Sequence, residues 1–367
     1  MVIPKNDRIV IRTFPDFDDQ GLELAQVLRQ RGHRVTWLIR DAASIEAAGR
    51  AVVDQPVAAG RSIAGVWAYL RAPVVLHTHG FYGSPRSSRR KTSINLWHGM
   101  PVKRLNSKPL VARHQTDVLT VTSGLHARNI ENEWKLSSGV CVVSGLPRND
   151  LLRPMSLSRD QNNPPMIVWM PTYRNSVFGE IRRDGREFKN VFQLPGASMQ
   201  DINARAADAG VRVVLKLHPM APEPECIPNW SNLQVLNDVD LRRQGTTTYR
   251  LLARSDLLIT DHSSVWIDYL LTGRPMIFSI ADLDEYSDTR GHYFPDLPAV
   301  LPGPIVRDMS ALFAAVKSAL AGSGEDAWRV RREEARSLHH HHEVRTSSSQ
   351  RVARIVERQL RSRSLLT

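Results

Sequence analysis

Apolar residues gather in short runs that alternate with helical patterns along most of the chain. In the first half, the apolar runs predict strands at 8–13, 34–39, 73–78, 94–97, 118–122 and 139–145. Helical spacing of apolar residues predicts helices at 18–32, 44–70 and 124–135. Because fully apolar strands separated by helices are buried on both faces, the pattern predicts a parallel sheet covered by helices.

The alternation stops over residues 151–165, a polar stretch rich in Pro and Asn, and then restarts. The second half predicts strands at 166–171, 211–217, 232–236, 256–260 and 275–280, helices at 197–209, 247–254 and 264–272, and further helical patterns from 308 onward. Residues 174–195 have weak periodicity, which predicts an exposed loop. We expect two doubly wound α/β domains facing a central cleft, at residues 1–155 and 165–322, with residues 323–367 forming helices that pack back across them.

Composition fits a globular protein, since 42% of the 367 residues are hydrophobic and 23% are charged. No apolar run approaches the roughly 18 residues that span a bilayer, and the N-terminus lacks the apolar core of a signal peptide. Cys141 and Cys226 have neither metal-like nor disulfide-like spacing. A cytoplasmic location fits these features best.

A net charge of +12 favours anionic partners such as nucleic acid, phospholipid or a phosphorylated substrate, although an arginine-rich solvated surface explains it equally well. No RNA-recognition signature is found, so nucleic acid is not an expected partner. The basic segment 84–93 and the amphipathic basic tail 349–366 could contact an anionic membrane. The alternatives are a solvated loop and a helix that packs onto the protein.

The tract "HHHH" at 339–342 resembles a metal-binding run, but it lacks neighbouring carboxylates or cysteines. It is expected to be an incidental surface tract, and no metal is predicted.

Polar residues follow several predicted strands at the sheet edge where ligands of such folds bind. They are His98 after 94–97, Thr172 and Arg174 after 166–171, His218 after 211–217, and Asp261, His262, Ser263 and Ser264 after 256–260. Ser263 and Ser264 precede a predicted helix, whose N-terminal N–H groups favour an anion such as phosphate. Plain helix capping by Asp261 or Ser263 and a loop role for His218 are the alternatives. The absence of GxxxxGK[ST] excludes a P-loop hydrolase.

The motifs "NLWHGMPVKRL", "SGLPRNDLL", "MPTYRN", "LKLHP" and "LLITDHSSVWIDYLLTGRPMIF", followed by "DLDEYSDTRGHYF", resemble the CDP-glycerol glycerophosphotransferase family in order and spacing. These enzymes build wall teichoic acid and related capsule polymers. The resemblance implies a GT-B fold, with two Rossmann-like domains and the donor held mainly by the second. It implies transfer of a polyol phosphate, foremost glycerol phosphate, from a CDP-activated donor to a hydroxyl of a lipid-linked saccharide or polymer. CMP would be released at the inner face of the cell membrane, without a cofactor.

A metal-free site must neutralise a diphosphate with hydroxyls, His, Arg and helix N-termini, and an alcohol nucleophile benefits from a base. By motif, His98 is the expected base, facing the donor across the cleft, and Gly99 lets acceptor and donor approach. The complete prediction is catalytic His98 and His218; donor-phosphate binding by Ser263, Ser264, His218, Arg148 and Arg174; nucleotide binding by Pro171, Thr172 and Asp268; and Trp97, Gly99 and Lys103 on the acceptor side.

Three positions depart from the family pattern, which commonly has Thr at Met100, Tyr at His262 and Phe at His292. The alternative function is a GT-B glycosyltransferase or epimerase that uses a nucleotide sugar. The sequence leaves open which CDP-alcohol is used, which acceptor receives it, how many units are added and the oligomeric state.

Overall fold

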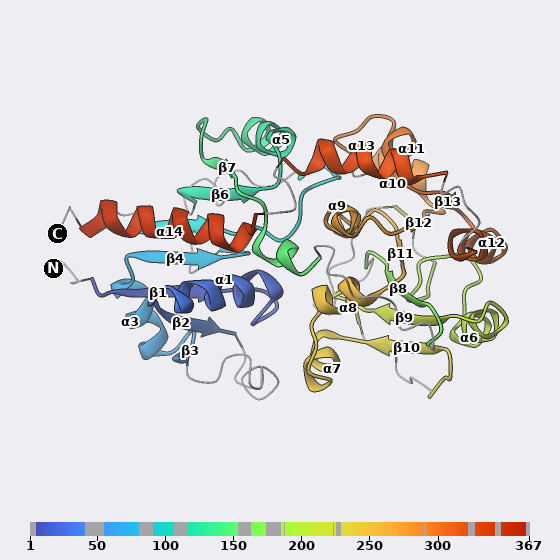
Figure 1. Cartoon of the computed structure of the whole chain (residues 1–367), viewed down its shortest axis with the longest axis horizontal. Coiled ribbons are helices and arrows are strands. Elements are labelled where there is room, and N and C mark those ends of the chain that lie inside the picture. The colour runs from blue at the N-terminus through green and yellow to red at the C-terminus, as the bar shows by residue number, and fades with distance from the viewer. Residues whose placement is uncertain are drawn as a thin grey trace.

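Two parallel sheets lie side by side along the long axis of the molecule (Figure 1). The structure, a computed structural model, describes residues 5–40, 55–80, 91–105, 116–152, 163–173, 185–186, 188–222, 224, 229–289, 291–321, 327–341 and 346–364. Within these ranges, no helix combines the length and apolarity that crossing a membrane requires.

The first sheet has seven strands in the order β3-β2-β1-β4-β5-β6-β7, all parallel. They are β1 (Arg8–Arg12), β2 (Arg34–Ile39), β3 (Val57–Ala59), β4 (Val74–His77), β5 (Thr92–Asn95), β6 (Val118–Val121) and β7 (Cys141–Val143). Alternate residues of β1 are buried on opposite faces: Ile9 and Ile11 pack in the cluster that includes Leu24, whereas Val10 packs with Tyr69. Burial on both faces explains the continuous apolar run of this strand.

The second sheet repeats the same topology with six parallel strands, in the order β10-β9-β8-β11-β12-β13. They are β8 (Met166–Met170), β9 (Arg212–Lys216), β10 (Leu233–Leu236), β11 (Leu257–Thr260), β12 (Met276–Ser279) and β13 (Ile305–Val306). Ile167 and Trp169 pack on one face and Val168 on the other. In each sheet the strand order reverses beside the first strand, which is the switch point where ligands of doubly wound folds bind.

Helices cover the sheets and connect their strands. They are α1 (Asp19–Gln30), α3 (Ile63–Arg71), α5 (Gly124–Trp134), α6 (Met199–Asp208), α7 (Asp238–Arg243), α8 (Thr248–Arg254), α9 (Val265–Tyr269), α10 (Leu283–Thr289), α11 (Leu297–Val300), α12 (Met309–Leu320), α13 (Arg329–His339) and α14 (Ser348–Ser364), with 3-10 turns η2 (Pro147–Leu152) and η3 (Leu270–Thr272).

Two segments differ from the sequence prediction. Strand β3 lies inside the predicted helix 44–70, because three residues bounded by Pro56 and Gly60 pair with β2 at the sheet edge, and α3 begins only after Ser62 caps it. Residues 44–54 of that helix lie outside the described residues. The predicted exposed loop 174–195 is wrong for its last part, since Phe192 and Leu194 are buried in the second core.

The C-terminal segment returns to the first half of the chain. Helix α14 lies beside β4 and α1 (Figure 1), and Val352, Ala353 and Val356 are fully buried there. The surface position expected for the histidine tract is wrong for His339, which is 1% exposed and bonded to the ring of His126. The apolar face of the tail is therefore used for packing.

Candidate functional site

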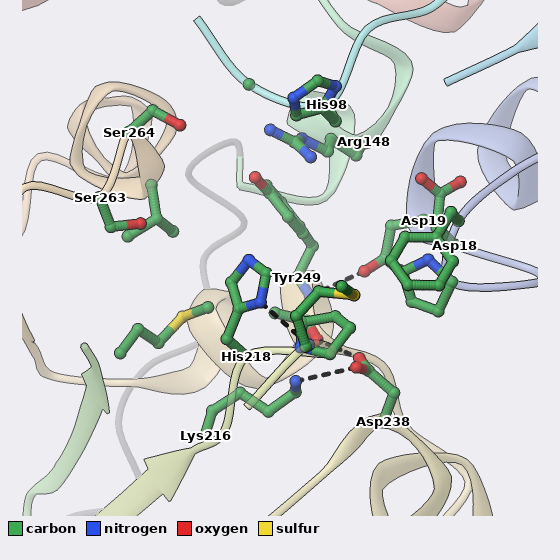
Figure 2. Close-up of a pocket in the computed structure, with 18 of the residues that line it drawn as sticks. Asp18, Asp19, His98, Arg148, Lys216, His218, Asp238, Tyr249, Ser263 and Ser264 are labelled. Atoms are coloured by element: carbon green, nitrogen blue, oxygen red, sulfur yellow. Dashed lines mark hydrogen bonds and ion pairs between the residues drawn. The ribbon is translucent and has the colours of Figure 1, made fainter. Parts of the chain in front are cut away.

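A cleft of about 580 Å³ lies between the two sheets, where the carboxyl ends of strands from both halves converge. Figure 2 shows His98 and Arg148 on one side of this pocket, with His218 facing them and Ser263 and Ser264 to one side. Residues separated by more than a hundred positions therefore share one cavity. Of these residues, the strand-end rule predicts His98, His218, Ser263 and Ser264 at the ligand edges of their sheets.

His98 is held between two aromatic rings. Its ring stacks on His79, with centroids 4.3 Å apart, and on Trp97, with centroids 4.5 Å apart. Its Nδ1 lies 3.4 Å from the carbonyl oxygen of Thr78. A carbonyl can only accept, so this contact favours the tautomer with the proton on Nδ1 and the basic lone pair on Nε2. The arrangement suits His98 to accept a proton.

His218 has the opposite arrangement. Its Nδ1 accepts the backbone N–H of Met220 at 3.1 Å, and its ring packs against Tyr173. Because Nδ1 accepts this hydrogen bond, a neutral ring carries its proton on Nε2, where it can be donated. His98 and His218 are thus arranged differently, one to accept and one to donate.

Gly99 lies where the backbone of the first domain comes close to Ser264 of the second. Its φ of +137° is strained for any residue with a side chain. A Cβ at this position would lie 2.6 Å from Oγ of Ser264 and 3.2 Å from Nη2 of Arg148. The glycine after His98 is therefore required for the backbone of the first domain to reach the serines of the second.

The loop after β11 is organised by Asp261. Its carboxylate accepts the backbone N–H and hydroxyl of Thr172, the latter at 2.6 Å, and the backbone N–H of Ser263 at 3.1 Å. Ser264 begins α9 without capping it through its side chain. Asp261 thus joins the ends of β8 and β11 at the switch point, and Ser264 lines the cleft.

Arg148 enters the cleft from η2 and forms a buried ion pair with Asp268 of α9, with Nη2 and Oδ2 2.6 Å apart. Its guanidinium also lies over the ring of Tyr249, whose hydroxyl donates to the same carboxylate at 2.5 Å. Asp268 is fully buried and does not line the cleft. The described contacts of Asp268 are with Arg148 and Tyr249, and its side chain does not line the pocket where nucleotide binding was predicted.

The other predicted residues divide as follows. Trp97, Lys103, Pro171 and Thr172 line the cleft, and Nζ of Lys103 donates to the hydroxyl of Tyr286 across the domains at 3.0 Å. Pro171 and Thr172 also line an adjoining hollow of about 300 Å³ together with Tyr173 and His218. Arg174 lies outside the described residues. The roles assigned to these side chains stay predictions.

Several charged residues of the cleft were missed by the sequence analysis. Lys216, at the end of β9, is 2% exposed and pairs with Asp238 at 3.1 Å. Asp18 and Asp19 begin α1 at the cleft, and Asp19 accepts the backbone N–H of Tyr249 across the domains at 2.9 Å. Burial raises the pKa of Asp18 to about 7. Carboxylates at a helix start look like ordinary caps in a sequence, and Asp18 does cap α1.

His262 and His292, two departures from the family pattern, contact each other. His262 has Nδ1 3.3 Å from Nε2 of His292 and Nε2 3.1 Å from Asp282, and its ring stacks on Tyr286. Neither histidine lines the cleft.

Among the described residues, no group of three or more His, Cys, Asp or Glu side chains could hold a metal ion.

Two Rossmann-type domains with a shared cleft define the GT-B class. Solved structures agree: the wall teichoic acid polymerase TagF matches with a TM-score of 0.76 at 18% identity, covering 98% of this chain and 90% of that one. A UDP co-structure of Staphylococcus aureus MnaA matches with a TM-score of 0.57 at 11% identity, covering 97% of each chain. At these identities the likeness establishes the fold.

The sequence profile of the CDP-Glycerol:Poly(glycerophosphate) glycerophosphotransferase family matches residues 2–358, and the chain belongs to this family. A teichoic acid glycerol-phosphate transferase of Staphylococcus aureus is 26% identical over 269 residues, or 64% of this chain and 63% of that protein. A teichoic acid poly(glycerol phosphate) polymerase of Bacillus subtilis is 27% identical over 256 residues, or 62% of this chain and 32% of that protein. The chain thus matches only part of the length of these relatives.

Proposed function

We propose that this protein transfers glycerol phosphate from CDP-glycerol to a hydroxyl of a teichoic-acid-like or capsular polymer, or of a lipid-linked saccharide, and releases CMP. The observation that supports this most is the cleft itself. It places a histidine arranged to accept a proton opposite a histidine arranged to donate one, with two serines and an arginine beside them. Membership of the glycerophosphotransferase family supports the same reaction.

The donor diphosphate is proposed to lie against the second domain. His218 donates from Nε2, the hydroxyls of Ser263 and Ser264 donate from the loop after β11, and Arg148 supplies a fixed positive charge. Phosphoryl transfer depends mostly on positioning and charge neutralisation, which these groups provide without moving. The cytidine is proposed to occupy the adjoining hollow beside Pro171, because that hollow opens next to His218.

The acceptor hydroxyl is proposed to enter from the first domain. Nε2 of His98 takes its proton as the oxygen attacks the β-phosphorus of the donor. A new bond forms between the acceptor oxygen and phosphorus, and the bond from phosphorus to the oxygen bridging to CMP breaks. CMP leaves with the electron pair of that bond, and His218 stabilises the developing charge or supplies a proton.

The finer partners belong to the same proposal. A lipid-linked acceptor would place the enzyme at the inner face of the cell membrane, and the net charge of +12 supports association with anionic lipid. The apolar face of the tail helix does not support it, because that face is buried against the first domain.

The test replaces His98 with Gln. Glutamine keeps hydrogen bonding but cannot accept the proton, so kcat should fall by about 10²–10⁴ while the dissociation constant for CDP-glycerol stays within about twofold. His33→Gln, a surface histidine paired with Glu357, is the matched control and should leave both unchanged. A nearly active His98→Gln enzyme contradicts the proposed base. Product masses that gain a sugar rather than glycerol phosphate contradict the proposed reaction.

A further inference from the structure

Helix α3 carries an exposed apolar face. Ile63 is 92% exposed, Trp67 47% and Val66 39%, and these three are the majority of the large hydrophobic residues exposed within the described part of the chain. The spacing of positions 63, 66 and 67 places them on one side of the helix. The opposite side, with Gly65 and Tyr69, is buried against the first sheet. Single exposed apolar residues are ordinary, whereas a grouped face marks a contact surface.

The surroundings of this face are cationic. Arg61 precedes α3, and the Arg71 guanidinium at its end lies 5.8 Å from the centroid of the Trp67 ring. Lys5 donates to the carbonyl of Leu70, at 2.7 Å, in the last turn of the helix.

The sequence around α3 has the same bias over a much longer range. No aspartate or glutamate occurs between Asp54 and Asp117, whereas ten lysines and arginines do. Their positive charges are therefore not balanced by acidic residues from the same stretch. Beside the helix itself, the exposed apolar side chains flanked by Arg61 and Arg71 suit a partner that accepts apolar groups and carries negative charge.

We propose that α3 docks the protein on an anionic lipid bilayer, with Ile63 and Trp67 at the boundary between head groups and acyl chains. Tryptophan is favoured at this boundary, and nearby arginines are attracted to anionic head groups. Helix α3 lies in the half of the molecule that carries both termini (Figure 1), on the domain that also supplies His98. The inference deepens the proposed membrane role and rests on it.

A second copy of the chain fits this face less well. A symmetric dimer across α3 would bring Arg61 and Arg71 of both copies together, without an acidic residue from this stretch to separate them. Anionic lipid meets both requirements of the surface, since it offers an apolar interior beneath a layer of negative charge.

The experiment measures binding of the full chain to phosphatidylcholine vesicles with and without phosphatidylglycerol. The variant Ile63→Ser/Trp67→Ser should lower the partition coefficient for the anionic vesicles by about tenfold or more. The matched control is Val330→Ser/Leu338→Ser, which removes the exposed apolar residues of α13 and should bind like the wild type. All four side chains are exposed, so equal melting temperatures verify that both variants fold.

Brominated lipid gives a second measurement. It should quench the fluorescence of the wild type more than that of Trp67→Phe, and high salt should weaken binding. Equal binding by the α3 variant and the wild type overturns the inference, as does a wild type that binds neither vesicle. A wild-type dimer that the α3 variant dissociates assigns the face to a second copy and also overturns it.

Turnover with a water-soluble acceptor separates this inference from the proposed function. The α3 variant should keep that turnover, because its substitutions lie outside the cleft. Loss of vesicle binding with retained turnover in the variant supports the docking role. A wild type that binds anionic vesicles but has no transferase activity contradicts the proposed function alone.

Discussion

Replacing Asp268 with Asn tests whether this residue acts inside the protein or on the substrate. Its carboxylate accepts from Arg148 at 2.6 Å and from Tyr249 at 2.5 Å, and the two charged side chains are 0% and 10% exposed. Asparagine keeps the shape but leaves Arg148 without its opposite charge. Breaking a buried ion pair by removing one partner typically destabilises a protein by about 3–5 kcal/mol.

The matched control is Asp201→Asn in the pair between Asp201 and Arg205 on α6. In that pair, Nε of Arg205 lies 3.0 Å from Oδ2 of Asp201, but the side chains of Asp201 and Arg205 are 39% and 37% exposed. Solvent screens such a pair, so its loss should destabilise by no more than about 0.5 kcal/mol. Thermal and urea unfolding of both variants measure the difference between them.

A double variant separates stability from donor binding. Arg148→Met/Asp268→Asn removes both charges, so it should recover part of the stability that Asp268→Asn alone loses. Its affinity for CDP-glycerol should stay low, because the arginine proposed to bind the diphosphate is absent. The reasoning is refuted if Asp268→Asn unfolds like the surface control. Reduced donor affinity at unchanged stability would instead support the direct nucleotide contact predicted from the sequence.

Three further predictions concern other parts of the molecule. Ser263→Ala/Ser264→Ala should weaken CDP-glycerol binding by about tenfold or more, through two lost hydrogen bonds, in a titration of the folded variant. Gly99→Ala should lower kcat/KM by about tenfold or more, because its Cβ would lie 2.6 Å from Ser264 Oγ. Burial lowers the pKa of His126 to about 3 and that of His339 well below its usual value. The unfolded chain therefore binds these protons first, and stability should fall as pH drops below about 6.5. His126 alone should account for about 2 kcal/mol of this loss at pH 5, and His339 should add to it, as measured by urea titrations.

The central strands could be predicted because burial on both faces leaves a plain record in the sequence. Ile9, Val10 and Ile11 are all fully buried, and a strand covered by helices on both sides requires such a run. Strand β3 could not be found this way, because an edge strand of three residues adds too few apolar positions to interrupt a helical pattern.

The candidate site was predictable where a polar residue directly follows a strand. This rule predicts His98, His218 and Ser263 at the ligand edges of their two sheets, and all three line the cleft. Lys216 was missed because it lies inside the strand pattern, and its pairing with Asp238 joins two neighbouring strand ends that a sequence shows only as separate charges. The burial of one member of such a pair depends on the fold around it.

His262 and His292 show how two departures from a family pattern can belong together. The family resemblance leads us to expect Tyr at position 262 and Phe at position 292, and thirty positions separate the two imidazoles in the sequence. In the fold, the rings share a hydrogen bond of 3.3 Å, and Asp282 accepts from the far side of His262. Each ring therefore supplies a hydrogen-bond partner for a ring nitrogen of the other. If only one of the two positions were histidine, that nitrogen would be buried without this partner. Neither ring lines the cleft. The two histidines therefore do not alter the surfaces proposed to bind the donor and the acceptor.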